Sequence, residues 1–388
     1  MTDGRCGLPR VRAPEGVHAL RSGRCLRGFF RRVFSKRRGR WPIAAGYVRA
    51  CVWPWSPGPP RIIDTHHGHP IMNRSTSRDR RAFLVTTTAA LAGIATPAWA
   101  KFDSGQFRIG YQKAASTLVL LKAKGTLEKR LAPLGVKVTW AEFPAGPQLL
   151  EGLNVGAIDF GYVGEAPPVF AQAAGADFVY TAYEVPTPHA EGIVVARQSP
   201  IRRVAELKGA KIGFNRGSDV HWFVIALLRK NGLDYGDIQP VFLAPADARA
   251  ALERGAIDAW AIWDPFLSAV QTQSGARLVA DAQGVASHHQ FFVSQREFAQ
   301  KRKDVIALTL DELGNEGQWV TQNLAAAAER LAPLQGLDAA TIRAGLAHYA
   351  HQYRPIDAAV LDEQQRIADT FYELKVIPRK IVTKEAVL

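Results

Sequence analysis

Short apolar runs alternate with amphipathic stretches along the chain from residue 107 onward. Runs rich in β-branched, aromatic and other apolar residues predict strands at residues 107–112, 136–142, 158–162, 178–183, 192–196, 211–214, 240–243, 257–262, 277–280 and 290–294. Patterns with the periodicity of a helix lie between most of these runs. This alternation is typical of an α/β fold with largely parallel sheets, which is the fold class we expect.

The clearest helical pattern covers residues 219–231. Apolar side chains recur there at positions 220, 223, 224, 227 and 228, all on one helical face, with Ser218 as the N-cap and Gly232 as the stop. After residue 290 the pattern becomes mainly helical. We expect helices at residues 298–313, 316–330, 339–350 and 357–374, followed by a surface tail at residues 375–388.

A four-residue repeat indicates two similar units. The sequence Gly-Ala-Ile-Asp at residues 156–159 recurs at residues 255–258, and both copies follow a helical pattern. Six residues after each aspartate comes an acidic residue, Glu165 or Asp264, and then proline, with which a helix can begin. Two α/β units that face each other across a cleft explain this repeat more simply than one continuous sheet.

Positive charge is concentrated at the start of the chain. Residues 1–71 contain 14 Lys and Arg against 3 Asp and Glu, and residues 72–100 contain 4 against 1, so residues 101–388 hold 31 of each. The balanced body gives no reason to expect nucleic-acid binding. Residues 1–71 are either a basic nucleic-acid arm or a misassigned start with Met72 as the true initiator, and we prefer the second interpretation.

Residues 72–100 have the layout of a cleavable export signal. Four arginines precede an apolar run at residues 82–95, and the small-residue site Ala98-Trp99-Ala100 follows. The segment around Arg80 and Arg81 is similar to a twin-arginine signal, although export by the general secretion route stays open. No cysteine follows the run, so we expect a soluble periplasmic protein without a lipid anchor. Its expected parts are a first lobe at residues 101–190, a second lobe at residues 191–290, and C-terminal helices at residues 291–388 that return towards the first lobe.

Ligands of α/β proteins bind where strands end and helices begin, and the unpaired N–H groups of a first helical turn suit an anion. Three segments have this character, at residues 112–117, 164–168 and 215–219. The candidate ligand-binding residues are Gln112, Ser116, Gly164, Glu165, Ala166, Arg216, Gly217, Ser218, Asp219, His221, Trp263 and Asp264. For Arg216 the alternative is an ordinary surface position, and His221 reaches either the cleft or solvent. Trp260 is a core candidate, whereas Trp263 ends its strand.

The sequence offers little for catalysis. Cys6, Cys25 and Cys51 are the three cysteines, so the body has no thiolate nucleophile, disulfide or cysteine metal site. Side chains of His288 and His289 should point to opposite faces of a strand and cannot easily share a metal ion. We therefore expect no catalytic residue, no metal and no cofactor. A lyase that depends on His221 is the enzyme alternative.

Seven stretches carry a family resemblance. They are RIGYQK at residues 108–113, EFPAGPQLL at 142–150, GEAPP at 164–168, GSDVH at 217–221, PADARAA at 245–251, WDPF at 263–266 and HQF at 289–291. Residues 106–300 thereby resemble the aliphatic-sulfonate-binding proteins of bacterial ABC importers, whose relatives bind taurine, nitrate or thiamine precursors. The related ligands remain the alternative for this chain.

The resemblance implies a type II periplasmic binding protein fold, with two lobes joined by two hinge crossings. It implies a small organosulfonate anion as ligand, an inner-membrane ABC permease as partner and a monomer. It places Gln112, Gly164, Glu165, Ser218, Asp219 and Asp264 near the ligand. Asp219 stands where relatives often have Asn, and Tyr162 precedes Val163 where a smaller residue is common. A carboxylate beside an anion disfavours a sulfonate unless it faces an amine. The family's fold also includes a sulfinate desulfinase, but that chemistry needs a cysteine nucleophile.

Overall fold

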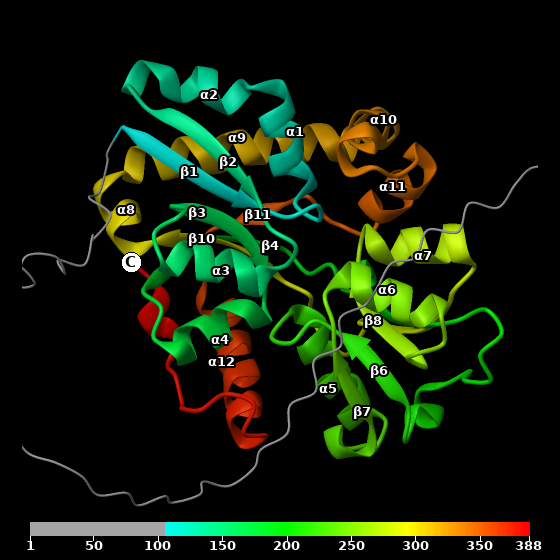
Figure 1. Cartoon of the computed structure of the whole chain (residues 1–388). Coiled ribbons are helices and arrows are strands. Elements are labelled where there is room, and N and C mark those ends of the chain that lie inside the picture. The colour runs from blue at the N-terminus through cyan, green and yellow to red at the C-terminus, as the bar shows by residue number, and fades with distance from the viewer. Residues whose placement is uncertain (1–104) are drawn as a thin grey trace, which may run out of the picture. The chain divides into compact units, whose positions relative to one another are not determined.

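The computed structural model describes residues 105–388. The basic extension expected at residues 1–71 and the signal segment expected at residues 72–100, with its cleavage near Ala100, lie outside the described residues. Within residues 105–388 the strands form two separate sheets, each with helices packed on both faces (Figure 1). The two-lobed α/β fold that we expected is therefore confirmed.

The first sheet has the strand order β11-β4-β10-β3-β1-β2. Its strands are β1 (Gln106–Tyr111), β2 (Lys137–Glu142), β3 (Phe160–Gly164), β4 (Phe178–Glu184), β10 (Gln290–Gln295) and β11 (Tyr353–Arg354). Helices α1 (Ser116–Lys124), α2 (Thr126–Leu131) and α9 (Lys303–Gln322) cover one face. The other face carries α3 (Gly146–Asn154), α4 (Ala166–Ala174) and α12 (Ala358–Glu373). We call this sheet and its helices the first lobe.

The second sheet has the order β7-β6-β8-β5-β9 and forms the second lobe with its helices. Its strands are β5 (Glu191–Val195), β6 (Lys211–Phe214), β7 (Gln239–Phe242), β8 (Ala259–Trp263) and β9 (Arg277–Asp281). Its helices are α5 (Asp219–Lys230), α6 (Pro245–Glu253) and α7 (Phe266–Ser274). The chain crosses between the lobes from β4 to β5 and again from β9 to β10.

The Gly-Ala-Ile-Asp repeat makes the same joint in both lobes. Ile158 packs closely on Gly110 in β1. A Cβ atom added to Gly110 would lie 2.4 Å from Cδ1 of Ile158. In the second lobe Ile257 packs in the same way on Gly213 in β6, where the corresponding distance is 2.5 Å. Each glycine makes room for the isoleucine that precedes the next parallel strand. The repeat therefore reflects two units built alike.

Both sheets are mixed, which corrects the expectation of largely parallel sheets. β10 runs antiparallel to β3 and β4, and β5 runs antiparallel to β8 and β9. All ten predicted strands are present with ends shifted by at most two residues. The two-residue strand β11 was not predicted.

The prediction of the C-terminal helices is confirmed only in part. The helix predicted at residues 357–374 agrees within one residue at each end, the one predicted at 339–350 begins at residue 339 but ends earlier, and the others have different bounds. The observed helices are α8 (Arg296–Lys301), α9, α10 (Leu324–Gln335), α11 (Ala339–Leu346) and α12. The break that we expected between residues 313 and 316 is absent. α9 continues through this segment, in which Gly314 is exposed. The last residues are no free tail, since Ile377 and Ile381 are buried against α4 and α12. No helix among residues 105–388 has the length and apolar character needed to cross a membrane.

Candidate functional site

The starts of α3, α4 and α5 meet at one small cavity between the lobes. Its lining consists of Gln112, Ala114, Gly146, Gly164, Pro167, Ser218, Asp219, Trp263 and Gln290. Five of these were predicted from the sequence: Gln112, Gly164, Ser218, Asp219 and Trp263. The cavity has a volume of about 10 Å³, which is room for about one water molecule. The predicted helix starts therefore converge, and the lobes are closed on each other.

The carboxyl group of Asp219 lies between the lobes, directly next to Gly164. Its Oδ1 accepts a hydrogen bond from the Ala166 N–H at 3.2 Å, and its Oδ2 accepts one from Gln290 Nε2 at 3.3 Å. A Cβ on Gly164 would lie 1.6–2.1 Å from the atoms of this group, so only glycine leaves it room. Donors of the first lobe thus converge on an acidic side chain of the second lobe, which is the arrangement that an anion site needs.

The environment of Asp219 makes its negative charge costly. Burial raises the pKa of Asp219 to about 6, while the charge of His288 lowers it and the carboxylate of Glu191 raises it further. The hydrogen bonds from Ala166 and Gln290 favour the ionised form but do not cancel the effect of burial. Asp219 consequently changes its charge close to neutral pH.

A layer of buried acidic groups lies beneath the cavity. Glu165 is fully buried, and its Oε2 accepts the N–H of His289 at 3.0 Å. Burial, together with the carboxylates of Glu191 and Asp219, raises the pKa of Glu165 well above its usual value. His288 Nδ1 lies 3.1 Å from Glu191 Oε2. This pair connects the second hinge crossing, which contains His288, to the start of β5 after the first crossing. Among residues 105–388, no group of three or more His, Cys, Asp or Glu side chains is arranged to hold a metal ion.

Two further predicted residues line a second cavity next to the first. Ser116 and Asp264 contribute to this space of about 10 Å³, and Ala114 lines both cavities. Asp264 is already partnered, because its Oδ1 accepts the Ser268 N–H at 2.9 Å and its Oδ2 lies 2.6 Å from His348 Nδ1. Its carboxylate is therefore held away from a ligand in the first cavity.

Three predicted residues lie away from the cavity. Arg216 is exposed and places its guanidinium 5.5 Å from the ring centre of Phe242, and Gly217 borders the same outer surface. His221 reaches neither the cleft nor solvent, in contrast to both interpretations of the sequence. It is buried among aromatic rings, its Nδ1 accepts the Gly217 N–H at 3.2 Å, and burial lowers its pKa to about 3. His221 supports the turn before α5.

Four cavity residues were not among the candidates: Ala114, Gly146, Pro167 and Gln290. Ala114 and Pro167 nevertheless lie in segments singled out from the sequence. Gln290 was not a candidate, because the sequence does not show the direction of β10. As an antiparallel strand, β10 places its first residue at the edge where the parallel strands end. Ser218 is the N-cap of α5 by position, but its hydroxyl donates to the Asn215 carbonyl and caps no N–H group.

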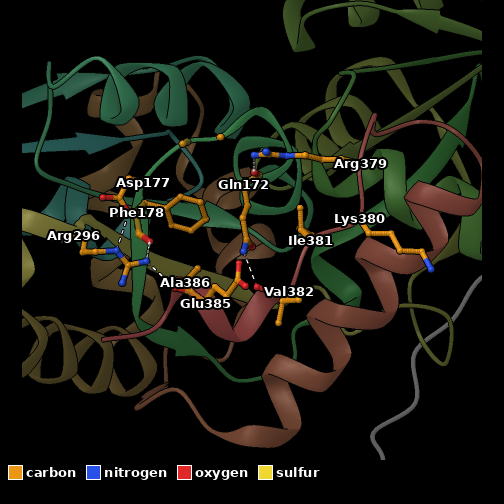
Figure 2. Close-up of a pocket in the computed structure, with 12 residues that line it drawn as sticks. Gln172, Asp177, Phe178, Arg296, Arg379, Lys380, Ile381, Val382, Glu385 and Ala386 are labelled. Carbon is orange, nitrogen blue, oxygen red and sulfur yellow. Dashed lines mark hydrogen bonds and ion pairs between the residues drawn. The ribbon is translucent and has the colours of Figure 1, made fainter.

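A larger hollow of about 390 Å³ lies on the first lobe, where the C-terminal segment packs against α4 (Figure 2). Its two arginines are used in holding the chain. Arg296 donates to Asp177 Oδ1 at 2.7 Å and to backbone carbonyls of the last residues, and Arg379 donates to the carbonyls of Gln172 and Ala173 at the end of α4. This hollow is a packing seam, and the cavity between the lobes remains the candidate site.

Known proteins are similar to this chain over most of residues 105–388. Residues 103–335 match the NMT1-like family. The chain is similar to the solved structure of the alkanesulfonate-binding protein SsuA from Xanthomonas axonopodis pv. citri bound to MOPS, with 44% identity, a TM-score of 0.71, and coverage of 73% of this chain and 98% of that one. It is also similar to the solved structure of the periplasmic aliphatic sulphonate binding protein SsuA from Escherichia coli, with 42% identity and a TM-score of 0.67. That match covers 73% of this chain and 92% of the other one. The taurine-binding periplasmic protein of Escherichia coli (strain K12) is 26% identical over 57% of this chain and 67% of its own length.

Proposed function

The chain belongs to the NMT1-like family and to the aliphatic sulfonate-binding proteins, and we propose that it is the substrate-binding component of an ABC importer for aliphatic sulfonates. The observation that carries this proposal is the meeting of the Ala166 N–H and the Gln290 amide on a carboxyl group from the other lobe. A sulfonate is ionised throughout the physiological pH range and presents three oxygens, so it suits the same donors.

We assign the anionic head group to the cavity between the lobes. Gln112, Gly164 and Gln290 of the first lobe and Ser218 of the second lobe would surround it, with Asp219 displaced towards solvent or facing an amine of the ligand. We expect five other candidate residues not to contact the head group, since each is partnered or lies outside the cavity. They are Ser116, Glu165, Arg216, His221 and Asp264. Binding would be coupled to hinge closure, because the ligand gains donors from both lobes only in the closed form.

The setting of this receptor is part of the proposal. Its relatives include proteins named periplasmic, so we place the protein in the periplasm, as a monomer that delivers its ligand to an inner-membrane permease. We propose a first lobe up to residue 190, a second lobe from 191 to 290, and C-terminal helices that return to the first lobe. The ligand would leave chemically unchanged, since the relatives are binding proteins.

A thermal unfolding series tests the proposed function. Ethanesulfonate, taurine, nitrate and sulfate are added to the purified protein, and we expect the sulfonates to raise the Tm. A ligand at about 100 times its Kd stabilises the folded state by about 2.7 kcal/mol. A Tm unchanged by every sulfonate would contradict the proposal. Stabilisation by nitrate alone would move the protein to a different ligand class.

A matched pair of variants localises the site. Gln290→Leu removes a donor at the cavity, and we expect it to weaken sulfonate binding by tenfold or more, since an unpaired charged oxygen is costly to bury. Gln322→Leu, at the exposed end of α9, should bind as the unchanged protein does. Equal affinity in both variants would exclude the cavity as the binding site.

A further inference from the structure

The carboxyl group of Asp219 holds the donors that an anionic head group needs. It belongs to the second lobe, yet its two oxygens accept the Ala166 N–H at 3.2 Å and the Gln290 amide at 3.3 Å, both from the first lobe. The cavity beside it has a volume of about 10 Å³, which is too small for a sulfonate group. A sulfonate that uses these donors must therefore displace the carboxyl group from them.

The displaced side chain stays next to the ligand. Asp219 is the first residue of α5, and this helix is anchored in the core of the second lobe by Val220, Phe223 and Val224, all of them buried. The helix fixes the backbone of Asp219 at the wall of the cavity. When the lobes close on a sulfonate, the carboxyl group is therefore within reach of the head group.

Two adjacent negative charges in this place would oppose binding. The lobes exclude water, so the repulsion between a carboxylate and a sulfonate is weakly screened. Among the described residues that line the cavity, Asp219 is the only one with a charged side chain. A proton on Asp219 removes the repulsion and takes up no space, whereas an ammonium group of the ligand brings three N–H donors that each need an acceptor.

A protonated Asp219 would also contribute to the site. A neutral carboxyl group has one O–H donor, whereas the ionised group only accepts hydrogen bonds. The second lobe would then add its own donor to those of Ala166 and Gln290 in the first lobe. One proton thus converts Asp219 from a competitor of the ligand into a partner of the ligand.

The other titratable groups that face Asp219 are His288 before β10, Glu191 in β5, Glu165 before α4 and Tyr349 after α11. Burial raises the pKa of Glu165 and that of Tyr349 well above their usual values, so both groups keep their protons near neutral pH. Burial lowers the pKa of His288, but the surrounding carboxylates, first of all Glu191, raise it overall. An experiment must therefore separate Asp219 from His288.

Given the proposed function, we propose that the receptor binds its sulfonate together with one proton, which is held by the carboxyl group of Asp219. The proton comes from the solvent and forms an O–H bond on the carboxylate, and this O–H donates to an oxygen of the head group. No other covalent bond changes. Asp219 thereby makes the affinity for a sulfonate depend on pH.

The direction of this dependence follows from the two states of the receptor. In the closed form, burial raises the pKa of Asp219 to about 6, and a neighbouring sulfonate raises it further. In the open form the group faces water, where an aspartate titrates near 3.8. Between these values the bound form holds more protons than the free form, so the affinity rises as the pH falls, by at most about tenfold per pH unit.

The test is a calorimetric titration of the full-length protein, as purified, with ethanesulfonate at pH 5.5, 6.5 and 7.5, in buffers that contain no sulfonate. We expect Kd to be lower at pH 5.5 than at pH 7.5 by tenfold or more. Titrations in two buffers with different heats of ionisation count the protons, and we expect proton uptake on binding at pH 6.5.

A matched pair of variants assigns the proton. Asp219→Asn keeps the shape of the side chain and removes its charge, so we expect it to bind ethanesulfonate at pH 7.5 at least tenfold more tightly than the unchanged protein does. Its Kd should depend little on pH, and it should take up no proton. Asp247→Asn is the same change in the first turn of α6, at an exposed position, and should keep the pH dependence of the unchanged protein.

Several results would overturn the proposal. One is a Kd of the unchanged protein that does not change with pH. Another is an Asp219→Asn protein that keeps the pH dependence, which would assign the proton to His288. A third is a preference for taurine at pH 7.5 that Asp219→Asn abolishes, without proton uptake by either ligand, which would pair Asp219 with an amine.

Two further results are kept apart from these. Thermal unfolding shows whether Asp219→Asn is folded, and Asp219→Ser provides the same comparison if it is not. Failure of every sulfonate to bind at all three pH values would overturn the proposed function itself.

Discussion

At the scale of single residues, Asp219 sets the chemistry of the cavity. It is the first residue of α5, where the free N–H groups favour a negative charge, but it is also buried between the lobes. Burial raises its pKa to about 6, so the effect of lost hydration exceeds that of the helix end and the two hydrogen bonds. The closed form therefore contains a carboxyl group that is more easily protonated than an aspartate in water.

Asp219→Asn should stabilise the protein at neutral pH. The folded-state pKa of Asp219 lies above the unfolded value near 3.8, so its favourable contribution is complete below about pH 3.8 and is lost as pH rises through about 6. At pH 7.5 the variant should exceed the unchanged protein by up to about 3 kcal/mol in free energy of unfolding, and the difference should vanish near pH 4. Urea denaturation at several pH values measures this difference. Asp369→Asn, at an exposed position of α12, serves as the control, and a less stable Asp219→Asn protein at pH 7.5 would contradict the prediction.

Single residues also show why the site was only partly predictable. Gln112, Gly164, Ser218 and Asp219 could be predicted because helix starts after strands are readable in the sequence. His221 could not, because it follows Asp219 by two residues and two residues turn a helix by about 200°. With Asp219 at the cavity, His221 must point to the opposite side of α5, into the aromatic core. The pattern of apolar residues in α5 did not show whether His221 points to the cavity or into the aromatic core.

At the scale of elements, the helices fall into two groups by the way they begin. α11 and α12 start with aspartates whose side chains accept a first-turn N–H group. α3, α4 and α5, which meet at the cavity, begin without any side-chain cap. Their first N–H groups are accordingly available to other acceptors, as Asp219 shows for α4. Helices elsewhere, such as α6 and α9, also begin without a side-chain cap, so what distinguishes α3, α4 and α5 is that their starts meet at the cavity.

The capped helices should depend on their caps. Asp357 Oδ1 accepts the Val360 N–H at 2.9 Å, and its Oδ2 accepts the Tyr183 hydroxyl at 2.9 Å. Asp357→Ala should therefore lower the free energy of unfolding by about 1 kcal/mol. Chemical denaturation measures the loss, and Glu329→Ala, at an exposed position of α10, should cause almost none. Equal losses in the two variants would refute a specific role of the cap.

Elements were predictable where the local pattern decides them. The ten long strands follow from runs of apolar residues, since these runs must be buried. Strand β11 has two residues and forms through its pairing with β4, which no local pattern reveals. We predicted two helices at residues 298–313 and 316–330, but α9 continues through residues 314–315. One glycine costs only about 1 kcal/mol in a helix, and α9 packs on the first sheet.

At the scale of the whole molecule, the C-terminal helices connect the lobes. α10 packs on α1 and α9 of the first lobe, and α11 packs on α7 of the second lobe. Just after α11, His348 Nδ1 lies 2.6 Å from Asp264 Oδ2 at the end of β8. This pair links the segment after α11 to the end of β8, the central strand of the second sheet.

The stabilisation by His348 should depend on pH. Its hydrogen bond to Asp264 raises the pKa of His348 above 6.5, despite partial burial. The contribution of His348 to the free energy of unfolding is therefore fully present below about pH 6.5, and it is lost as the pH rises through the higher pKa of the folded state. His348→Gln should destabilise the protein more at pH 5.5 than at pH 8.5, as measured by chemical denaturation. A loss that does not change with pH would show that the pair is not ionic.

The direction of the strands could not be read from the sequence. Apolar runs look alike in parallel and antiparallel strands, and the partner of β10 lies more than a hundred residues away in the chain. The closed state of the cavity was equally hidden, because it depends on how two lobes meet. The two-lobed architecture could be predicted, since the Gly-Ala-Ile-Asp repeat reports the same local joint twice.

The position of β10 inside the first sheet has a consequence for how this protein is made. β10 separates β3 from β4, so a growing chain that stops before residue 290 contains two strands with no neighbour between them. Their open hydrogen-bonding edges would attract other unfinished chains. The first lobe can therefore mature only when synthesis has passed three quarters of the polypeptide, and a premature stop or an early cut yields an aggregating fragment instead of half a receptor.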